Sequence, residues 1–166
     1  MLNGFRVQIG DFLRYIEDLT IEIPALPRPT LPELRTRFPW IKEEGGIESD
    51  ISLKGLVVLR LGTVLRPDEP RIDGPEYERR MLGVPALGFQ HADWIVEHQD
   101  DDTPAFAALR ALRGKVYIDF RGLIVVSEDG HRDFPYVNDD GLRFVQRWDW
   151  TDHDLDQIGR VAVSGK

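Results

Sequence analysis

The sequence contains no cysteine among its 166 residues. A disulfide-stapled scaffold, a thiolate zinc site and a cysteine nucleophile are therefore all excluded. The lack of cysteine is typical of a protein from a reducing compartment, and we expect a cytoplasmic location.

Long apolar runs are also missing. The most apolar stretch, residues 56–65, has about half the length that a membrane-spanning helix needs, and it contains Arg60. The start of the chain, from Met1 to Gln8, lacks the apolar core of a secretory signal. We therefore expect no association with a membrane.

The short motifs that mark common nucleotide and catalytic sites are absent too. The chain has no phosphate-binding loop ending in Gly-Lys-Ser or Gly-Lys-Thr, no Gly-x-Gly-x-x-Gly, no Gly-x-Ser-x-Gly and no His-Glu-x-x-His. We expect no cofactor, and we interpret the protein as non-catalytic.

The sequence has fewer basic than acidic residues. The 21 basic side chains face 29 acidic ones, which gives a formal net charge of −8. This balance argues against direct binding of a nucleic-acid backbone, because proteins that bind phosphate chains present a basic face. Seventeen of the basic residues are arginines, whose planar guanidinium groups suit carboxylate or phosphate partners, although a GC-rich genome produces the same excess.

What the chain does have is enough apolar material for one core. A hydrophobic content of 42% over this length predicts a single domain, residues 1–166. A proline-rich connector, residues 24–39, is expected to be extended, with one short helix at Glu33 to Arg37.

Helices are predicted where apolar residues recur every three or four positions. Three segments have this spacing, at about 5–19, 85–99 and 103–113. The last is the best marked, because Thr103 can cap its start, Pro104 fits the first turn and Gly114 can close its end. A further short helix is expected from Pro75 to Met81.

Strands are predicted where the period changes to two. Residues 56–65 indicate a buried strand, and residues 115–164 indicate an antiparallel meander with two-residue turns at Asp129-Gly130 and Asp140-Gly141. The expected fold class is α+β, with the helices packed on the C-terminal meander and the 56–65 strand added to that sheet or to its edge.

The expected turns bring polar and aromatic residues to one face. With two-residue loops, Glu128 faces His131, Asp133 faces Trp148, and His131 faces Trp150. Asp152 and His153 then lie just beyond this edge of the sheet. Such a cluster is typical of an acid/base site, a divalent-ion site or a protein contact with aromatic residues at its centre.

Two further acidic clusters resemble metal sites without meeting their geometry. His91 and His98, which precede Asp100, Asp101 and Asp102, lie about 10.5 Å apart along a helix and do not share one ion. The three aspartates oppose the helix dipole, which indicates that they have a partner.

The second cluster has the alternating carboxylates of a calcium loop, Asp152, Asp154 and Asp156. The sixth and twelfth positions of that loop would be Gln157 and Val163, where glycine and glutamate are required. We interpret it as an acidic turn.

The first functional hypothesis is a non-catalytic acidic interaction protein, an adaptor, inhibitor or immunity-type partner that engages a basic protein surface, including by nucleic-acid mimicry. The residues assigned to this binding are Asp100, Asp101, Asp102, Trp148, Trp150, Asp152, Asp154 and Asp156.

Two alternatives stay open. One is a small metal-dependent hydrolase that uses Glu128, His131 and Asp133, with Asp152 or His153 as a further group. The other is a structural subunit of a larger assembly, with Trp40, Trp94 or Trp150 as contacts. The sequence sets no oligomeric state.

Overall fold

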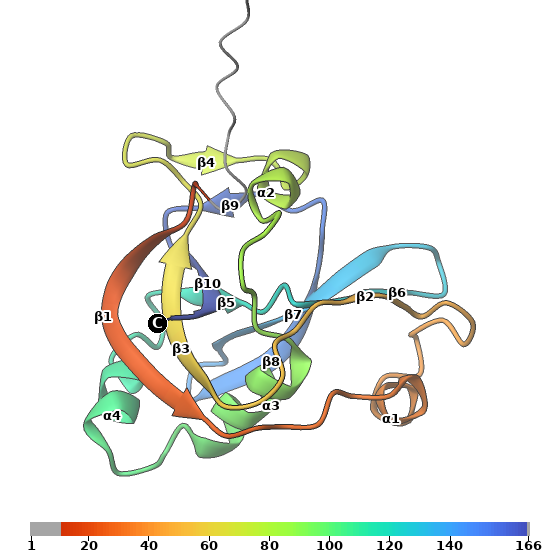
Figure 1. The fold of residues 1–166 in the computed structure, drawn as a ribbon, viewed down its shortest axis with the longest axis horizontal. Coiled ribbons are helices and arrows are strands. Elements are labelled where there is room, and N and C mark those ends of the chain that lie inside the picture. Colours follow the sequence, from red (N-terminus) through yellow and green to blue (C-terminus); the bar gives the residue numbers. More distant parts are fainter. Residues whose placement is uncertain (1–10, 166) are drawn as a thin grey trace, which may run out of the picture.

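The computed structural model of the chain describes residues 11–165 and shows an α+β fold (Figure 1). The helices of this part are α1 (Leu31–Arg37), α2 (Gly74–Arg80), α3 (Phe89–His98) and α4 (Pro104–Arg110). The strands are β1 (Arg14–Ile23), β2 (Ile47–Asp50), β3 (Val57–Thr63), β4 (Arg71–Ile72), β5 (Tyr117–Asp119), β6 (Leu123–Val126), β7 (Arg132–Asp139), β8 (Phe144–Trp150), β9 (Leu155–Asp156) and β10 (Gly159–Ser164).

Eight of these strands form one large, mostly antiparallel sheet in the order β1-β3-β10-β5-β7-β6-β2, with β8 paired to the free side of β7. β5 and β6 pair with successive parts of the same β7 strand. A separate two-stranded sheet, β4 and β9, lies with α2 at one end of the molecule, and α3 and α4 lie at the other end (Figure 1).

The helix predicted over residues 5–19 is wrong where the structure describes it. Residues 14–23 form strand β1, whose buried side chains alternate at Leu19, Ile21 and Ile23. The earlier apolar residues fit a helical period, but β-branched residues and pairing with β3 decide the local structure. Residues 5–10 of the predicted helix lie outside the described part.

The C-terminal strands β5 to β8 are antiparallel, as predicted, and β6, β7 and β8 follow the order of a meander. β5 pairs with β7 instead of β6, and the end of the predicted meander is wrong. The last strand, β10, does not follow β8 but lies between β3 and β5, antiparallel to the first and parallel to the second. The 56–65 prediction corresponds to β3, which is inside the sheet rather than at its edge because β1 and β10 pair with its two sides.

The other helix predictions are confirmed within a few residues. Thr103 caps α4 and Thr30 caps α1 through side chains that accept backbone N–H groups. Asp73 caps α2 in the same way. α3 begins after Gly88 rather than at Pro85. No helix among residues 11–165 is long and apolar enough to cross a membrane.

Both faces of the sheet are covered. The largest apolar cluster joins β1, β3 and β5 to α3 and α4, through residues such as Leu59, Ile95 and Leu109. Alternation along β10 assigns Ala162 to this cluster and Val161 to a second cluster on the opposite face, where α2, β4 and β9 pack.

A third, aromatic cluster lies where α1 packs on the β6–β7 hairpin. It joins Leu34 of α1 and Val125 of β6 to Phe89 of α3, with Trp40 and Trp148 half-buried against them. The segment after α1 is tied to the hairpin by backbone pairing between Ile41 and Ser127, among others. This cluster supports the candidate site.

Helix α2 is fixed by one buried arginine. The Arg80 side chain is 6% exposed and pairs with Glu69 at 2.6 Å and with Glu76 at 2.8 Å. Hydrogen bonds lower the pKa of both carboxyls to about 2, from Arg80 in the case of Glu69 and from Arg79 and Arg80 in the case of Glu76. The position of α2 in turn fixes Tyr77, which points into the core.

The two hairpin turns differ from the expected ones. The first has a three-residue loop, Glu128 to Gly130, because Ser127 pairs with His131. The second has the two-residue loop Gly141-Leu142, one residue later than predicted. Both loops contain a glycine with positive φ, which is +85° at Gly130.

Gly130→Ala is expected to destabilise the protein by about 1 kcal/mol, because an alanine at positive φ is strained even though no atom blocks its Cβ. Gly130→Asn should lose less, since asparagine tolerates this conformation better. Urea unfolding of the three proteins measures both effects. An alanine variant as stable as the unaltered protein would contradict the turn geometry.

Candidate functional site

The candidate site is built on β7 and its neighbours. Asp133 of β7 lies opposite Trp150 of β8, and Pro135 lies opposite Trp148. The register differs from the predicted one by two residues. Because side chains alternate with a period of two, this difference leaves Asp133, Trp148 and Trp150 on the predicted common face.

These side chains line a pocket of about 500 Å³. Its lining consists of Trp40, Ser127, Glu128, Asp129, Asp133, Trp148 and Trp150, and we call it the tryptophan pocket. Three of the four tryptophans of the chain are thus gathered around three carboxylates.

Trp148 is the fixed wall of the tryptophan pocket. Its ring lies edge-on to Trp40 at 5.3 Å and to Phe38 at 5.2 Å, and it stacks on Phe89 at 5.7 Å. Contacts from three sides leave the indole little freedom. Its Nε1–H group is buried and has no hydrogen-bond partner among the described residues.

Trp150 is the open wall, with 44% of its surface exposed. His131 stacks flat on it at 4.4 Å, and His153 lies at 5.4 Å. Asp149 contacts Nδ1 of His153. His131 and His153, which the sequence analysis placed near Trp150, therefore pack against its exposed indole ring.

Asp133 is the buried acid of the tryptophan pocket, with 5% of its surface exposed. Its Oδ2 atom is buried and accepts no hydrogen bond from any described residue. Burial raises the pKa of this carboxyl to about 6, against a smaller opposing effect of His131. A buried carboxyl without a donor is rare, and it indicates a missing partner.

Glu128 and Asp129 are exposed at the hairpin tip. The backbone N–H of Glu128 donates to the Trp40 carbonyl at 2.9 Å, which holds the tip against the segment after α1. The Ser127 hydroxyl donates to Asp129 and lowers the pKa of its carboxyl. Among the described residues, neither acid pairs with a lysine or arginine.

The aspartates at the end of α3 lie apart from the tryptophan pocket. Asp101 accepts a contact from His98 at 3.0 Å, and Asp100 and Asp102 are exposed. Arg110 donates to the backbone carbonyls of Gln99 and Asp101, which offsets the dipole conflict noted in the sequence.

The acidic turn after β8 is likewise separate. Asp154 lies 3.6 Å from Arg71, and Asp156 accepts a hydrogen bond from the Tyr117 hydroxyl at 3.1 Å. Asp152 is exposed. The structure therefore unites Glu128, Asp133 and the two tryptophans but not the remaining predicted binding residues.

The metal-dependent alternative gains no support from this geometry. Within residues 11–165, no group of three histidines or acids is placed to hold a metal ion. His91, which the spacing to His98 already argued against as a metal ligand, is buried, and its Nδ1 accepts the Gly88 N–H at 3.0 Å. Burial lowers the pKa of His91 to about 4.

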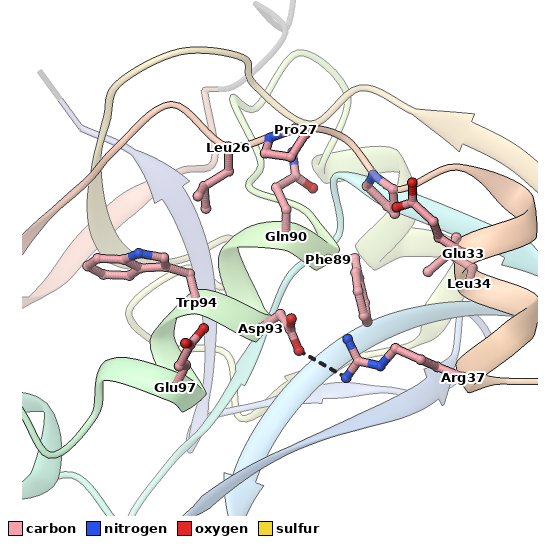
Figure 2. Close-up of a pocket in the computed structure, with 11 residues that line it drawn as sticks. Leu26, Pro27, Glu33, Leu34, Arg37, Phe89, Gln90, Asp93, Trp94 and Glu97 are labelled. Carbon is pink, nitrogen blue, oxygen red and sulfur yellow. Dashed lines mark hydrogen bonds and ion pairs between the residues drawn. The ribbon is translucent and has the colours of Figure 1, made fainter.

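A second pocket of about 240 Å³ lies between the proline-rich connector and α3 (Figure 2). Its lining is Leu26, Pro27, Pro29, Glu33, Leu34, Arg37, Phe89, Gln90, Asp93, Trp94 and Glu97. Asp93 points toward Arg37 and pairs with it at 3.0 Å, so part of its charge is balanced within the chain. The tryptophan pocket has no such arginine and is the better site for an external cation.

Sequence patterns missed Trp40, Ser127 and Asp129 as pocket residues. Trp40 joins through the packing of α1 on the hairpin, which no local period reveals. The sequence predicted Asp129 as a turn residue. Its place in the pocket lining follows from the three-residue loop, which the sequence did not predict.

None of three comparisons with known proteins finds a relative. No protein-family model, no curated protein and no solved structure matches the chain. The function of the tryptophan pocket is therefore inferred from its own residues.

Asp133→Asn is expected to flatten the pH dependence of stability. Because the pKa of this carboxyl is raised in the folded protein from 3.8 to about 6, its contribution to stability is full below about pH 4 and is lost as the pH rises through 6. At about pH 8 the variant should be more stable than the unaltered protein by roughly 1 kcal/mol. This gain is smaller than the free energy that corresponds to the whole pKa shift, because solvent in the open pocket screens the charge.

Melting temperatures measured across this range test the sign. Asp129→Asn, which removes an exposed acid with a lowered pKa, is the matched control and should show no gain at high pH. If the melting temperatures of Asp133→Asn and the unaltered protein change in parallel with pH, the Asp133 carboxyl has an ordinary environment and the account of a buried, unpaired acid is wrong.

Proposed function

We propose that this protein is a non-catalytic binding protein that takes a basic segment of a partner protein into the tryptophan pocket. The observation that carries the proposal is the buried, unpaired carboxyl of Asp133 between Trp148 and Trp150. A cationic arginine or lysine side chain is the complement of such a site.

Two orphaned atoms narrow the class of ligand. Oδ2 of Asp133 needs an N–H donor, whereas Nε1–H of Trp148 needs an acceptor. An arginine or lysine residue in a peptide supplies both, because its side chain donates and its backbone carbonyl accepts. A simple metal cation would satisfy the acid alone.

The aromatic walls favour the same ligand. A guanidinium or ammonium group over an indole face gains about 0.5–2 kcal/mol, and arginine can also stack on the ring. Trp150 is exposed enough to receive it. Glu128 and Asp129 at the mouth add attraction at long range, as does the net charge of −8.

The biological consequence of binding forms part of the same proposal. An adaptor, an inhibitor or an immunity-type partner needs only to occupy a basic surface, and acids spaced over the chain suit mimicry of a nucleic acid. A cytoplasmic setting is proposed on the absence of cysteine.

A short acetylated and amidated peptide with a central arginine tests the proposal. Titration should give a saturable change in tryptophan fluorescence, since three of the four tryptophans line the site. The same peptide with citrulline, which keeps the shape and loses the charge, should bind about tenfold more weakly or worse. Equal binding of the citrulline peptide would refute the electrostatic basis.

Variants locate the binding. We expect two variants to bind the arginine peptide with about tenfold lower affinity: Trp150→Ala and the double variant Glu128→Gln, Asp129→Asn. The charge-matched double variant Asp100→Asn, Asp102→Asn should change it by about twofold or less, because those acids lie outside the pocket. An equal loss in both double variants would indicate attraction to the whole acidic surface and overturn the pocket assignment.

A further inference from the structure

Arg121 carries a buried guanidinium without a partner. The residue is 5% exposed, it makes no hydrogen bond or ion pair with the described residues, and its Nη1 atom is fully buried and unsatisfied. Arginines this deeply buried are ordinarily paired, because an isolated buried charge is costly. The group therefore needs an explanation of its own.

Tyr77 contacts both this guanidinium and a nearby buried acid. The Tyr77 ring lies 4.0 Å from the guanidinium carbon of Arg121, while its hydroxyl donates to Asp119 at 2.7 Å. Phe134 lies beside the same guanidinium at 4.5 Å. Two rings thus pack on the planar group. Burial raises the pKa of Asp119 to about 7, and Arg121 opposes this shift by Coulombic attraction without forming a hydrogen bond or ion pair with the carboxyl.

The guanidinium lines a small, mostly apolar cavity of about 170 Å³. The cavity residues are Ser49, Ile51, Glu78, Met81, Leu82, Gly83, Ala86, Arg121, Ile124 and Arg132. Ile51 and Leu82 are 57% and 60% exposed, which is high for large apolar side chains. They are positioned to cover an apolar ligand.

The other basic residue of this cavity, Arg132, is already paired with acids. Arg132 pairs with Glu48 at 2.7 Å and with Glu78 at 2.6 Å. These hydrogen bonds lower the pKa of Glu78. Arg121 attracts Glu78 more weakly, without a hydrogen bond or ion pair, so it is the basic group of the cavity that remains available to hydrogen-bond a ligand.

We propose that this cavity binds the carboxylate of a small apolar monocarboxylic acid, with Arg121 as the anion-binding residue. A planar carboxylate matches a guanidinium in shape and accepts its N–H groups in charge-assisted hydrogen bonds. The apolar lining suits an aliphatic or aromatic body. Phosphate fits poorly, because a dianion needs more donors than one arginine provides.

The proposed acid site is separate from the tryptophan pocket. Asp133 and Phe134 are neighbours on β7, so their side chains point to opposite faces of the sheet. The tryptophan pocket lies on the side of Asp133, and Arg121 lies on the side of Phe134. The two sites are proposed for ligands of opposite charge and can be tested independently.

Calorimetric titration with hexanoate and benzoate tests the proposal, with hexanol, benzamide and inorganic phosphate as matched probes. We expect saturable binding of at least one acid at one site per chain, and binding of its uncharged analogue at least about tenfold weaker. Absence of saturable binding for both acids, or tighter binding of phosphate, would overturn it.

Two variants identify the site. Arg121→Met removes the charge at similar length and should abolish acid binding while the protein stays folded, because an unpaired buried charge is exchanged for an apolar group. Leu82→Glu places a repelling carboxylate among the exposed cavity residues and should weaken binding about tenfold. If Arg121→Met does not fold, Leu82→Glu still tests whether the acid binds in this cavity.

Leu142→Glu is the control, because Leu142 is 84% exposed and lies outside the cavity. It makes the same chemical change and should leave acid binding unaltered. Equal weakening by Leu82→Glu and Leu142→Glu would show that the acids respond only to net charge.

Discussion

The pairing register of β7 is the constraint on which both sites depend. This strand pairs with β5 and β6 on one side and with β8 on the other, so its side chains alternate between two covered faces. Asp133 faces the tryptophans, and Phe134 faces Arg121. A slip of one residue would exchange these faces and destroy both arrangements.

Each face holds one charged side chain that the fold leaves unpaired. Asp133 lies among indole rings, and Arg121 lies between Tyr77 and Phe134, in each case with a buried polar atom that lacks a partner. The buried guanidinium of Arg80, by contrast, is closely paired with two glutamates. Local exceptions of this kind are expected where ligands complete the structure.

The side chains of both sites are held rigidly, which distinguishes a binding site from a core that only contains unpaired polar atoms. Trp148 is packed by three other aromatic rings, and Arg121 is stacked against two. Neither side chain can turn readily to find an internal partner. Both are therefore held in position for a ligand, which lowers the entropy lost on binding.

Much of the fold was predictable from local patterns. The caps at Thr103 and the change of period after Gly114 located α4 and the following strands. The common face of Asp133 and Trp148 was predicted although the turn between β7 and β8 was placed one residue too early. That error moves the pairing of the two strands by two residues, and a side-chain period of two conceals it.

What local patterns missed depends on contacts between distant segments. The apolar residues before Leu19 fit a helix, and only pairing with β3 makes this segment a strand. The insertion of β10 beside β5 has no local signal. The same holds for Trp40 in the tryptophan pocket and for Arg121, which packs on Tyr77 of the distant helix α2.

The most direct measurement for the tryptophan pocket is an NMR titration of the Asp133 carboxyl carbon, in the free protein and with a bound arginine peptide. The free carboxyl should titrate with a pKa of about 6, and the bound cation should lower that value. An ordinary pKa in the free protein, or a raised pKa that the peptide leaves unchanged, would contradict the account.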